Sequence, residues 1–281
     1  MAQPTPKLIP IAKWMKKSSM HFFDRNPSAL AAPGFVPLCN QMVLDIMATG
    51  FEPFSRDTYY ITCRARMILS NNLKSDVYQE DEVFKAETAI NTHLDRLHNY
   101  FDTRIAQGEQ KLELGGFGSD EIQRLVTNYE TRSVTNAVTQ YLEILAKADL
   151  YLTILHYLWV TSELSDSPDE AMRVKLNTER EVRQNLFGIG RFSSQHFRNI
   201  QRICNGVLDE RQKDRERQSE RDKAKAAERV KRQEEEKAQR QAAAEQRRNE
   251  SREKRQSAKT QAISTAQSDM DSLSAAVPAT A

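Results

Sequence analysis

The sequence contains few of the residues on which disulfide frameworks, metal clusters and membrane spans depend. Its three cysteines, Cys39, Cys63 and Cys204, are widely separated among 281 residues. Neither a disulfide framework nor a CxxC metal cluster fits that number and spacing, so we expect three reduced thiols. The longest apolar stretch, Leu150 to Val160, contains a histidine and is too short to cross a bilayer. The sequence therefore argues against a membrane span.

Aromatic residues are missing from the last part of the chain, because none follows Phe197. Residues 209–261 contain 18 Lys and Arg against 13 Asp and Glu, whereas the first 208 residues hold 23 basic and 24 acidic groups. The overall net charge of +2 therefore averages a nearly neutral body and a basic, charge-dense tail. A segment as polar as this tail cannot build a hydrophobic core of its own.

These differences predict three segments. Residues 1–28 are rich in proline and lysine and read as a flexible N-terminal arm. They lack a continuous apolar segment followed by a cleavage site, so we expect a cytoplasmic location. Residues 29–208 form a mainly helical body, and residues 209–281 form a low-complexity tail. The tail has strong helix formers but no apolar seam for a coiled coil, so we expect a solvated, partly formed helix followed by disorder.

Most of the body has apolar residues at helical spacing. The predicted helices cover residues 33–50, 76–106, 119–129, 134–164, 167–187 and 193 onward into the tail. Gly108 and the glycines at 115, 116 and 118 are expected to end the second helix, and Gly188 and Gly190 to separate the last two. The helix at 134–164 has the broadest apolar surface and is expected at the centre of the core.

The segment from Thr58 to Met67 shows a different pattern, because its residues alternate between apolar and polar as in a half-buried strand. A single strand in a helical body has no partner for its backbone groups. Two copies of the chain could pair this strand antiparallel with itself, which predicts a homodimer. An amphipathic edge strand and the beginning of a helix are the alternatives. The polar face of the proposed strand consists of Tyr60, Thr62, Arg64 and Arg66.

Two features suit contact with DNA. A two-stranded ribbon can enter the major groove, where arginine reads guanine, and Asn71, Asn72 and Lys74 after the strand could bind phosphates. Asp76 and Glu80 oppose that second contact. The other feature is the pair of helices around residues 188–191, whose second helix carries polar and basic side chains and which resembles a helix-turn-helix. An ordinary helical hairpin is the alternative that we favour, because helix pairs joined by short glycine-containing loops are common without any nucleic acid. The second helix has His196, Arg198, Asn199, Gln201 and Arg202.

The sequence offers little for catalysis or for a metal. Asp95 and His98, with His93 nearby, make only half of a two-metal site in a helical bundle, and a second half is missing. His156 lies in the most apolar helix and is expected to be buried with a hydrogen-bond partner. No nucleophile with a neighbouring base is recognisable, and Gly115–Gly118 lacks the lysine of a phosphate-binding loop. We therefore expect no enzyme activity, no metal and no cofactor.

Several of these segments together resemble the AcaB-like family of transcriptional regulators, found on conjugative plasmids and integrative conjugative elements. The resemblance covers about residues 58–200. It rests on the segment Tyr59–Arg66, the acidic and aromatic helix start Asp76–Asp81, the helix Tyr141–Trp159, the segment Val182–Phe187, and the pair Arg191–Phe192.

The resemblance implies a dimeric, ribbon-helix-helix DNA-binding protein that regulates conjugative-transfer genes, as an activator. Its groove-reading strand would correspond to Tyr60, Thr62, Arg64 and Arg66. The chain departs from that small module because a clear first helix is missing after the strand and because many further helical residues follow. A helical scaffold or assembly protein that works through the charged tail is the alternative.

Overall fold

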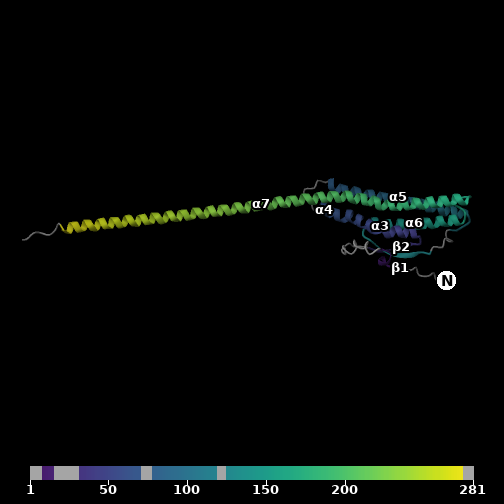
Figure 1. The fold of residues 1–281 in the computed structure, drawn as a ribbon, viewed down its shortest axis with the longest axis horizontal. Helices are drawn as coiled ribbons and strands as arrows, with labels where there is room; N and C mark the ends of the chain where they lie inside the picture. The colour runs from purple at the N-terminus through teal and green to yellow at the C-terminus, as the bar shows by residue number, and fades with distance from the viewer. Residues whose placement is uncertain (1–7, 16–31, 71–77, 119–124, 275–281) are drawn as a thin grey trace, which may run out of the picture. The chain divides into compact units, whose positions relative to one another are not determined.

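The computed structural model describes residues 8–15, 32–70, 78–118 and 125–274. The chain divides between Glu210 and Arg211 into two units, which are described separately here. The first unit contains a helical bundle and a small sheet (Figure 1). Its helical elements are α1 (Ile11–Trp14), α3 (Gln41–Tyr59), the π-helix η2 (Tyr60–Ala65), α4 (Arg66–Ser70), α5 (Tyr78–Leu114), α6 (Asn136–Val160), and α7 (Pro168–Ser274) as far as Glu210. The predicted mainly helical fold is confirmed.

The sheet has three strands in the order β1-β3-β2 and contacts α6 (Figure 1). β1 (Leu8–Ile9) runs parallel to β3 (Thr127–Ser133), and β2 (Ala32–Leu38) runs antiparallel to it, with Ala32 opposite Ser133 and Leu38 opposite Thr127. The helix predicted at residues 33–50 is therefore wrong at β2, and the helix predicted at residues 119–129 is wrong where it overlaps β3. Pro33 and Pro37 lack the backbone N–H that a helix needs, and both are tolerated in an edge strand such as β2.

Part of the predicted N-terminal arm packs onto this sheet. Ile11 and Met15 are buried in the hydrophobic core. The indole N–H of Trp14 donates to the backbone oxygen of Glu130 at 2.9 Å, and the Ile11 N–H donates to the Glu130 carboxylate at 3.1 Å. These contacts with β3 hold the segment from Leu8 to Met15 in place.

A buried carboxylate of α6 fixes the junction of β2 and α3. Asp149 accepts the backbone N–H of Cys39 at 3.0 Å and that of Asn40 at 2.7 Å, and the Cys39 thiol lies 3.1 Å from its Oδ2. Asn40 in turn caps α3, because its side chain accepts the N–H of Met42 at 2.9 Å. The helix therefore begins at Gln41 rather than at Pro33, and it continues past Gly50, where the sequence predicted its end.

The predicted ribbon strand at residues 58–67 is wrong, because this segment is helical throughout. Ile61, Ala65 and Leu69 are buried four residues apart on one face of the helix, whereas Met67, an apolar position of the proposed strand, is exposed. The hydroxyls of Thr58 and Thr62 donate to the carbonyl oxygens four residues earlier, at 2.8 and 2.9 Å. Core packing therefore overrides the β preference of the side chains. The ribbon that motivated the homodimer prediction does not form in this chain.

The helices predicted at 76–106, 134–164 and from 167 correspond to α5, α6 and the start of α7. α5 passes through Gly108 and ends at Leu114, later than predicted. A Cβ at Gly108 would lie 2.5 Å from Cγ2 of Ile154, so this glycine permits close packing of α5 on α6 rather than ending the helix. α6 is the central helix, and the residues buried along it include Val138, Tyr141, Leu145, Ala148, Leu152 and Leu155.

Helix α7 is continuous, so the predicted break at Gly188 and Gly190 is wrong, and with it both the helix-turn-helix and the helical hairpin. Within the first unit α7 runs antiparallel to α5, because Glu181 lies near Arg104 whereas Phe192 lies against His93 (Figure 1). Its buried side follows helical spacing across the glycines. That side consists of Val182, Leu186, Ile189, Ser193, Ile200, Cys204 and Val207.

The second unit consists of the rest of α7, which is helical to Ser274 and so extends further than the partly formed helix we expected. The side chains from Gln212 to Asn249 are exposed. Glu228 and Arg232, which are four positions apart, form an ion pair at 3.2 Å. Among the helices that the structure describes, none combines the length and the apolar character that a bilayer crossing requires.

Candidate nucleic-acid interface

The four residues of the proposed ribbon do not form one face. The Tyr60 ring packs against Phe197 of α7, with centroids 5.1 Å apart. Burial, and to a smaller extent the neighbouring Cys204, raises the pKa of Tyr60 to about 12. The phenol therefore stays protonated and packed. Thr62 bonds to the helix backbone, and Arg66 forms an ion pair with Glu87 of α5. Arg64 is exposed.

Asn71, Asn72 and Lys74, the predicted phosphate contacts, lie outside the described residues. The helical geometry thus removes the groove-reading strand, because alternate residues on a helix point in different directions. Thr62 and Arg66 instead lie together at a cavity between η2, α5 and the start of α6.

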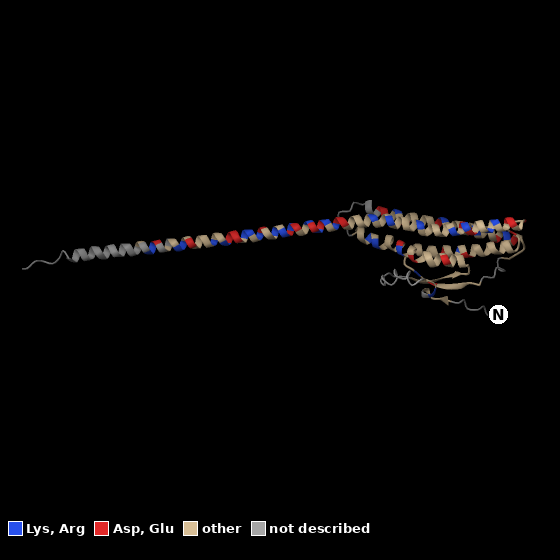
Figure 2. Cartoon of the chain, viewed as in Figure 1, with Lys and Arg blue, Asp and Glu red and all other residues tan. Residues whose placement is uncertain are grey.

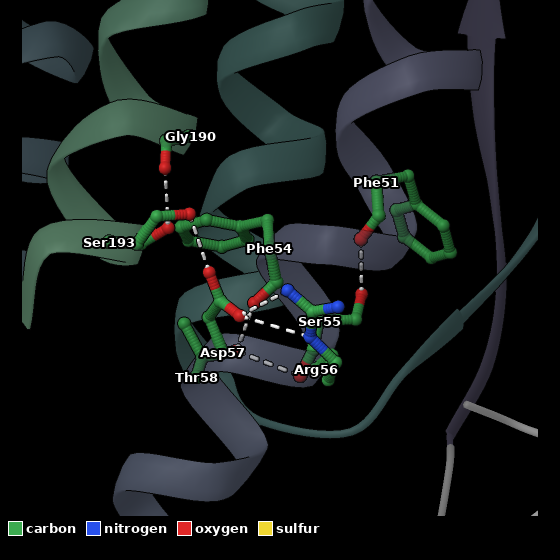
Figure 3. Close-up of polar contacts among 9 residues, drawn as sticks. Phe51, Phe54, Ser55, Arg56, Asp57, Thr58, Gly190 and Ser193 are labelled. Atoms are coloured by element: carbon green, nitrogen blue, oxygen red, sulfur yellow. Dashed lines mark hydrogen bonds and ion pairs between the residues drawn. The ribbon is translucent and has the colours of Figure 1, made fainter. Parts of the chain in front are cut away.

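A polar contact fixes α7 on α3 (Figure 3). The side chain of Asp57 is fully buried and accepts the hydroxyl of Ser194 at 2.7 Å. Arg56 pairs with the other oxygen of the same carboxylate at 2.9 Å, and its guanidinium also lies 5.6 Å from the centre of the Phe197 ring. Because a buried carboxylate needs such partners, this contact constrains both the position and the rotation of α7.

An aromatic stack holds α7 against α5. The Phe192 ring lies between His93 and His196, with ring centroids 4.7 Å from each. Burial lowers the pKa of both histidines, and the nearby Arg96 adds to the effect at His93. Neutral rings therefore occupy this contact. His93 and His196 serve packing here, which is a role that sequence reasoning missed.

The remaining histidine predictions have different outcomes. His98 lies 3.7 Å from Glu143, and no metal-binding group of three or more suitable side chains occurs among the described residues. His156 is exposed, with its ring 5.7 Å from that of Trp159, so the prediction of a buried histidine is wrong. The buried, apolar side of α6 lies next to His156 and does not include it.

The outward side of α7 carries five exposed arginines, which we call the α7 arginine face. At about 100° per residue, they fall within an arc of about 40° opposite the buried side of the helix. Between Glu181 and Asp209 the sequence contains no acidic residue. None of the five arginines forms an ion pair with another described residue. The α7 arginine face consists of Arg173, Arg180, Arg191, Arg198 and Arg202.

Amide side chains accompany these arginines. Gln184, Gln195 and Asn199 are exposed on or beside the same side of α7, and Phe187 lies among them with 45% of its surface exposed. Between Glu181 and Asp209 all of the charged side chains in the sequence are arginines, whereas residues 211–249 mix both signs of charge (Figure 2). Arginine and amide side chains can bind phosphates and the edges of bases. The outward side of α7 therefore has the chemistry of a nucleic-acid interface.

Sequence reasoning found part of this surface. Arg198, Asn199 and Arg202 were assigned to the second helix of the pair, but Arg173, Arg180 and Arg191 were missed. Helical spacing continued through Gly188 and Gly190 would have identified all five arginines, because the apolar residues on both sides of the glycines keep the same phase.

Comparison with known proteins gives a fold relationship. No family model matches the chain. No curated protein matches it either. Among solved structures, the fold is similar to that of AcaB from uropathogenic E. coli, with a TM-score of 0.52 and 16% sequence identity over 65% of this chain and 86% of that chain. The likeness supports the resemblance at the level of the fold, and the functional argument rests on the residues of α7.

Proposed function

We propose that this protein is a DNA-binding transcriptional regulator that contacts duplex DNA through the α7 arginine face. The observation that carries the proposal is the row of exposed arginines on α7, of which Arg191, Arg198 and Arg202 lie in a stretch without acidic residues. The contacts of Ser194 with Asp57 and of Phe192 with His93 hold this part of α7 in a fixed orientation. Unpaired arginines are free to neutralise phosphates, and this electrostatic contribution dominates the affinity of many DNA-binding proteins.

The dimensions of the face agree with this role. Arg191 and Arg202 are eleven positions apart, which corresponds to about 16 Å along the helix axis. A helical segment of that length fits within the major groove of B-DNA, where guanidinium and amide groups can read base edges. We assign the arginines mainly to phosphate contacts and assign Gln195 and Asn199 to base contacts.

The resemblance to the AcaB-like family and the fold shared with AcaB support regulation of transcription. On that basis we propose that the regulated genes serve conjugative transfer, that the effect is activation, and that the protein acts as a homodimer. Two copies would place two α7 arginine faces on one site, as in other two-fold DNA-binding proteins. Sedimentation with and without duplex DNA would measure the number of copies.

The DNA-binding proposal is tested by replacing Arg191, Arg198 and Arg202 together with glutamine. We expect much weaker binding to a short random-sequence duplex, because three phosphate contacts are lost. The slope of log affinity against log salt should become shallower by about three, at roughly one per phosphate contact. Fluorescence anisotropy across a series of NaCl concentrations measures both quantities.

A matched control removes the same charge elsewhere. Arg215, Arg221 and Arg229 are exposed arginines of the second unit, and their replacement by glutamine should leave affinity and salt slope nearly unchanged. Equal losses in both triple variants would mean non-specific attraction to net charge and would contradict the assignment to α7. Replacing Gln195 and Asn199 with alanine should reduce discrimination between selected and random duplexes without changing the salt slope.

A scaffold function has one observation in its favour, the helix of the second unit that continues to Ser274 with exposed charges of both signs. Such a helix can bind a partner through ion pairs. It would act without the α7 arginine face, so the triple variant at Arg191, Arg198 and Arg202 should leave a scaffold function intact.

A further inference from the structure

The cavity beside η2 has a volume of about 260 Å³. It is lined by η2 with the adjoining ends of α3 and α4, by α5, and by the first turn of α6. A volume near the lower end of the range for small-molecule sites suits a ligand of amino-acid size. π-helical turns such as η2 are rare and occur often at functional sites.

The lining of this cavity combines apolar and polar side chains. Ile61, Ile90 and Ala137 are buried and form the apolar part. The polar part includes Thr62, Arg66, Glu87, Asn91 and Asn136. An apolar lining with a few polar groups is typical of a site that orients a small polar ligand.

A positively and a negatively charged side chain line the same cavity. Arg66 of α4 and Glu87 of α5 form an ion pair through Nη2 and Oε2. Only 16% of the surface of the Glu87 side chain is exposed. Within the described part of the chain, this pair leaves the other carboxylate oxygen and the other two guanidinium nitrogens uncommitted. One side of a ligand can therefore meet a carboxylate while another meets a cation.

The first turn of α6 adds donors to the positive side of the cavity. Thr135 caps this helix by accepting the N–H of Val138, and the N–H groups of Asn136 and Ala137 belong to the first turn, which has no partners within the helix. Such donors favour a carboxylate. The Thr135 hydroxyl also bonds to Thr58 at 3.3 Å, which joins the start of α6 to the end of α3 beside the cavity.

We propose that this cavity, which we call the η2 pocket, binds a small zwitterion of the amino-acid class. Its ammonium group lies against Glu87, and its carboxylate lies toward Arg66 and the first turn of α6. The side chain of the ligand rests on Ile61 and Ile90. This site is separate from the α7 arginine face, so the proposal does not depend on DNA binding.

The test is a screen of the full-length protein against each standard L-amino acid, with inorganic phosphate and simple alkylamines as single-charge probes. We expect at least one amino acid to raise the melting temperature in a concentration-dependent way, because a ligand that binds the native state stabilises it. Isothermal titration calorimetry then gives the affinity. The single-charge probes should bind at least about tenfold more weakly, because each lacks one charged contact.

Two variants locate the site. Glu87→Gln should weaken binding of the identified amino acid about tenfold or more, whereas Glu82→Gln on the same helix, whose partner is Lys85, should leave it unchanged. Asn91→Leu replaces a polar side chain of the lining with an apolar one and should also abolish binding. It serves as the second variant if Glu87→Gln lowers the helical content.

Three results would overturn the proposal. One is the lack of any melting shift with all of the amino acids. Another is binding that survives both Glu87→Gln and Asn91→Leu. The third is binding of phosphate alone as tight as that of the amino acid, which would indicate an anion site. None of these results bears on the triple arginine variant of α7, so failure here is distinguishable from failure of the DNA-binding proposal.

Discussion

Gly108 of α5 and Gly188 of α7 both lie inside long helices, but their surroundings differ. A Cβ at Gly108 would lie 2.5 Å from Cγ2 of the fully buried Ile154, whereas a Cβ at Gly188 would meet no atom within 4 Å. The Cγ2 of a β-branched residue cannot move away easily, because it is attached next to the backbone. The same residue type is therefore required at one position and costs helix stability at the other.

This contrast gives a prediction for two alanine variants. Gly188→Ala should raise the free energy of unfolding by about 0.5 to 1 kcal/mol through helix propensity. Gly108→Ala should lower it by about 1 to 3 kcal/mol, since overpacking exceeds the propensity gain. Urea unfolding followed by circular dichroism measures both values. Equal stabilisation by the two substitutions would mean that α5 and α6 are not closely packed at Gly108.

At the scale of elements, α7 is attached by contacts of two kinds, the Asp57–Ser194 hydrogen bond to α3 and the stack of His93, Phe192 and His196 with α5. We predict that this stack makes the stability of the protein depend on pH. Both histidines have lowered pKa values in the folded protein, chiefly because of burial. Below pH about 6.5 the unfolded chain takes up protons that the folded protein resists, so stability is complete above that pH and falls as the pH drops toward the folded values.

The pH prediction is tested with His93→Phe combined with His196→Phe, which keeps aromatic rings in the stack. This variant should lose less stability than the original protein between pH 7.5 and pH 5.5, a range chosen around the ordinary histidine pKa of about 6.5. His156→Gln, at an exposed position of α6, is the control and should behave like the original protein. Parallel pH profiles for all three proteins in urea unfolding would argue against a titrating stack.

The elements also show what the sequence can and cannot predict. α5, α6 and the start of α7 were predictable because long periodic apolar patterns depend on local sequence. The segment at 58–67 was not, because its alternation of apolar and polar residues matches the two-residue period of a strand. Its helical state depends on core contacts with distant residues, such as Phe197 against Tyr60.

The candidate site also has one part that local sequence predicts and another that depends on packing. The chemistry of Arg198, Asn199 and Arg202 could be recognised from the sequence, whereas their shared orientation with Arg173, Arg180 and Arg191 depends on α7 passing straight through Gly188 and Gly190. Glycine disfavours a helix by only about 1 kcal/mol. Buried contacts on both sides, at Leu186, Ile189 and Ser193, outweigh that cost. Local propensity therefore predicted a break that packing prevents.

At the scale of the whole molecule, the hydrophobic core and the densest run of charged side chains lie in different parts of the chain. Among the residues whose burial the structure describes, every core residue precedes Arg211, while residues 209–261 carry 18 basic and 13 acidic side chains. We predict that a chain ending at Glu210 unfolds at nearly the same temperature as the full chain, because burial of apolar surface supplies most of the stability. Thermal unfolding followed by circular dichroism compares the two.

The same truncation should separate the two proposed functions. If the α7 arginine face binds DNA, the chain ending at Glu210 retains its preference for a selected duplex over random competitor, because that face remains complete. Its affinity for random DNA should fall modestly at low salt, since the removed part carries a surplus of positive charge that attracts phosphates without reading sequence. A competition gel shift at two salt concentrations measures both effects. Loss of the sequence preference in a truncated protein that still melts cooperatively would assign DNA recognition to the second unit.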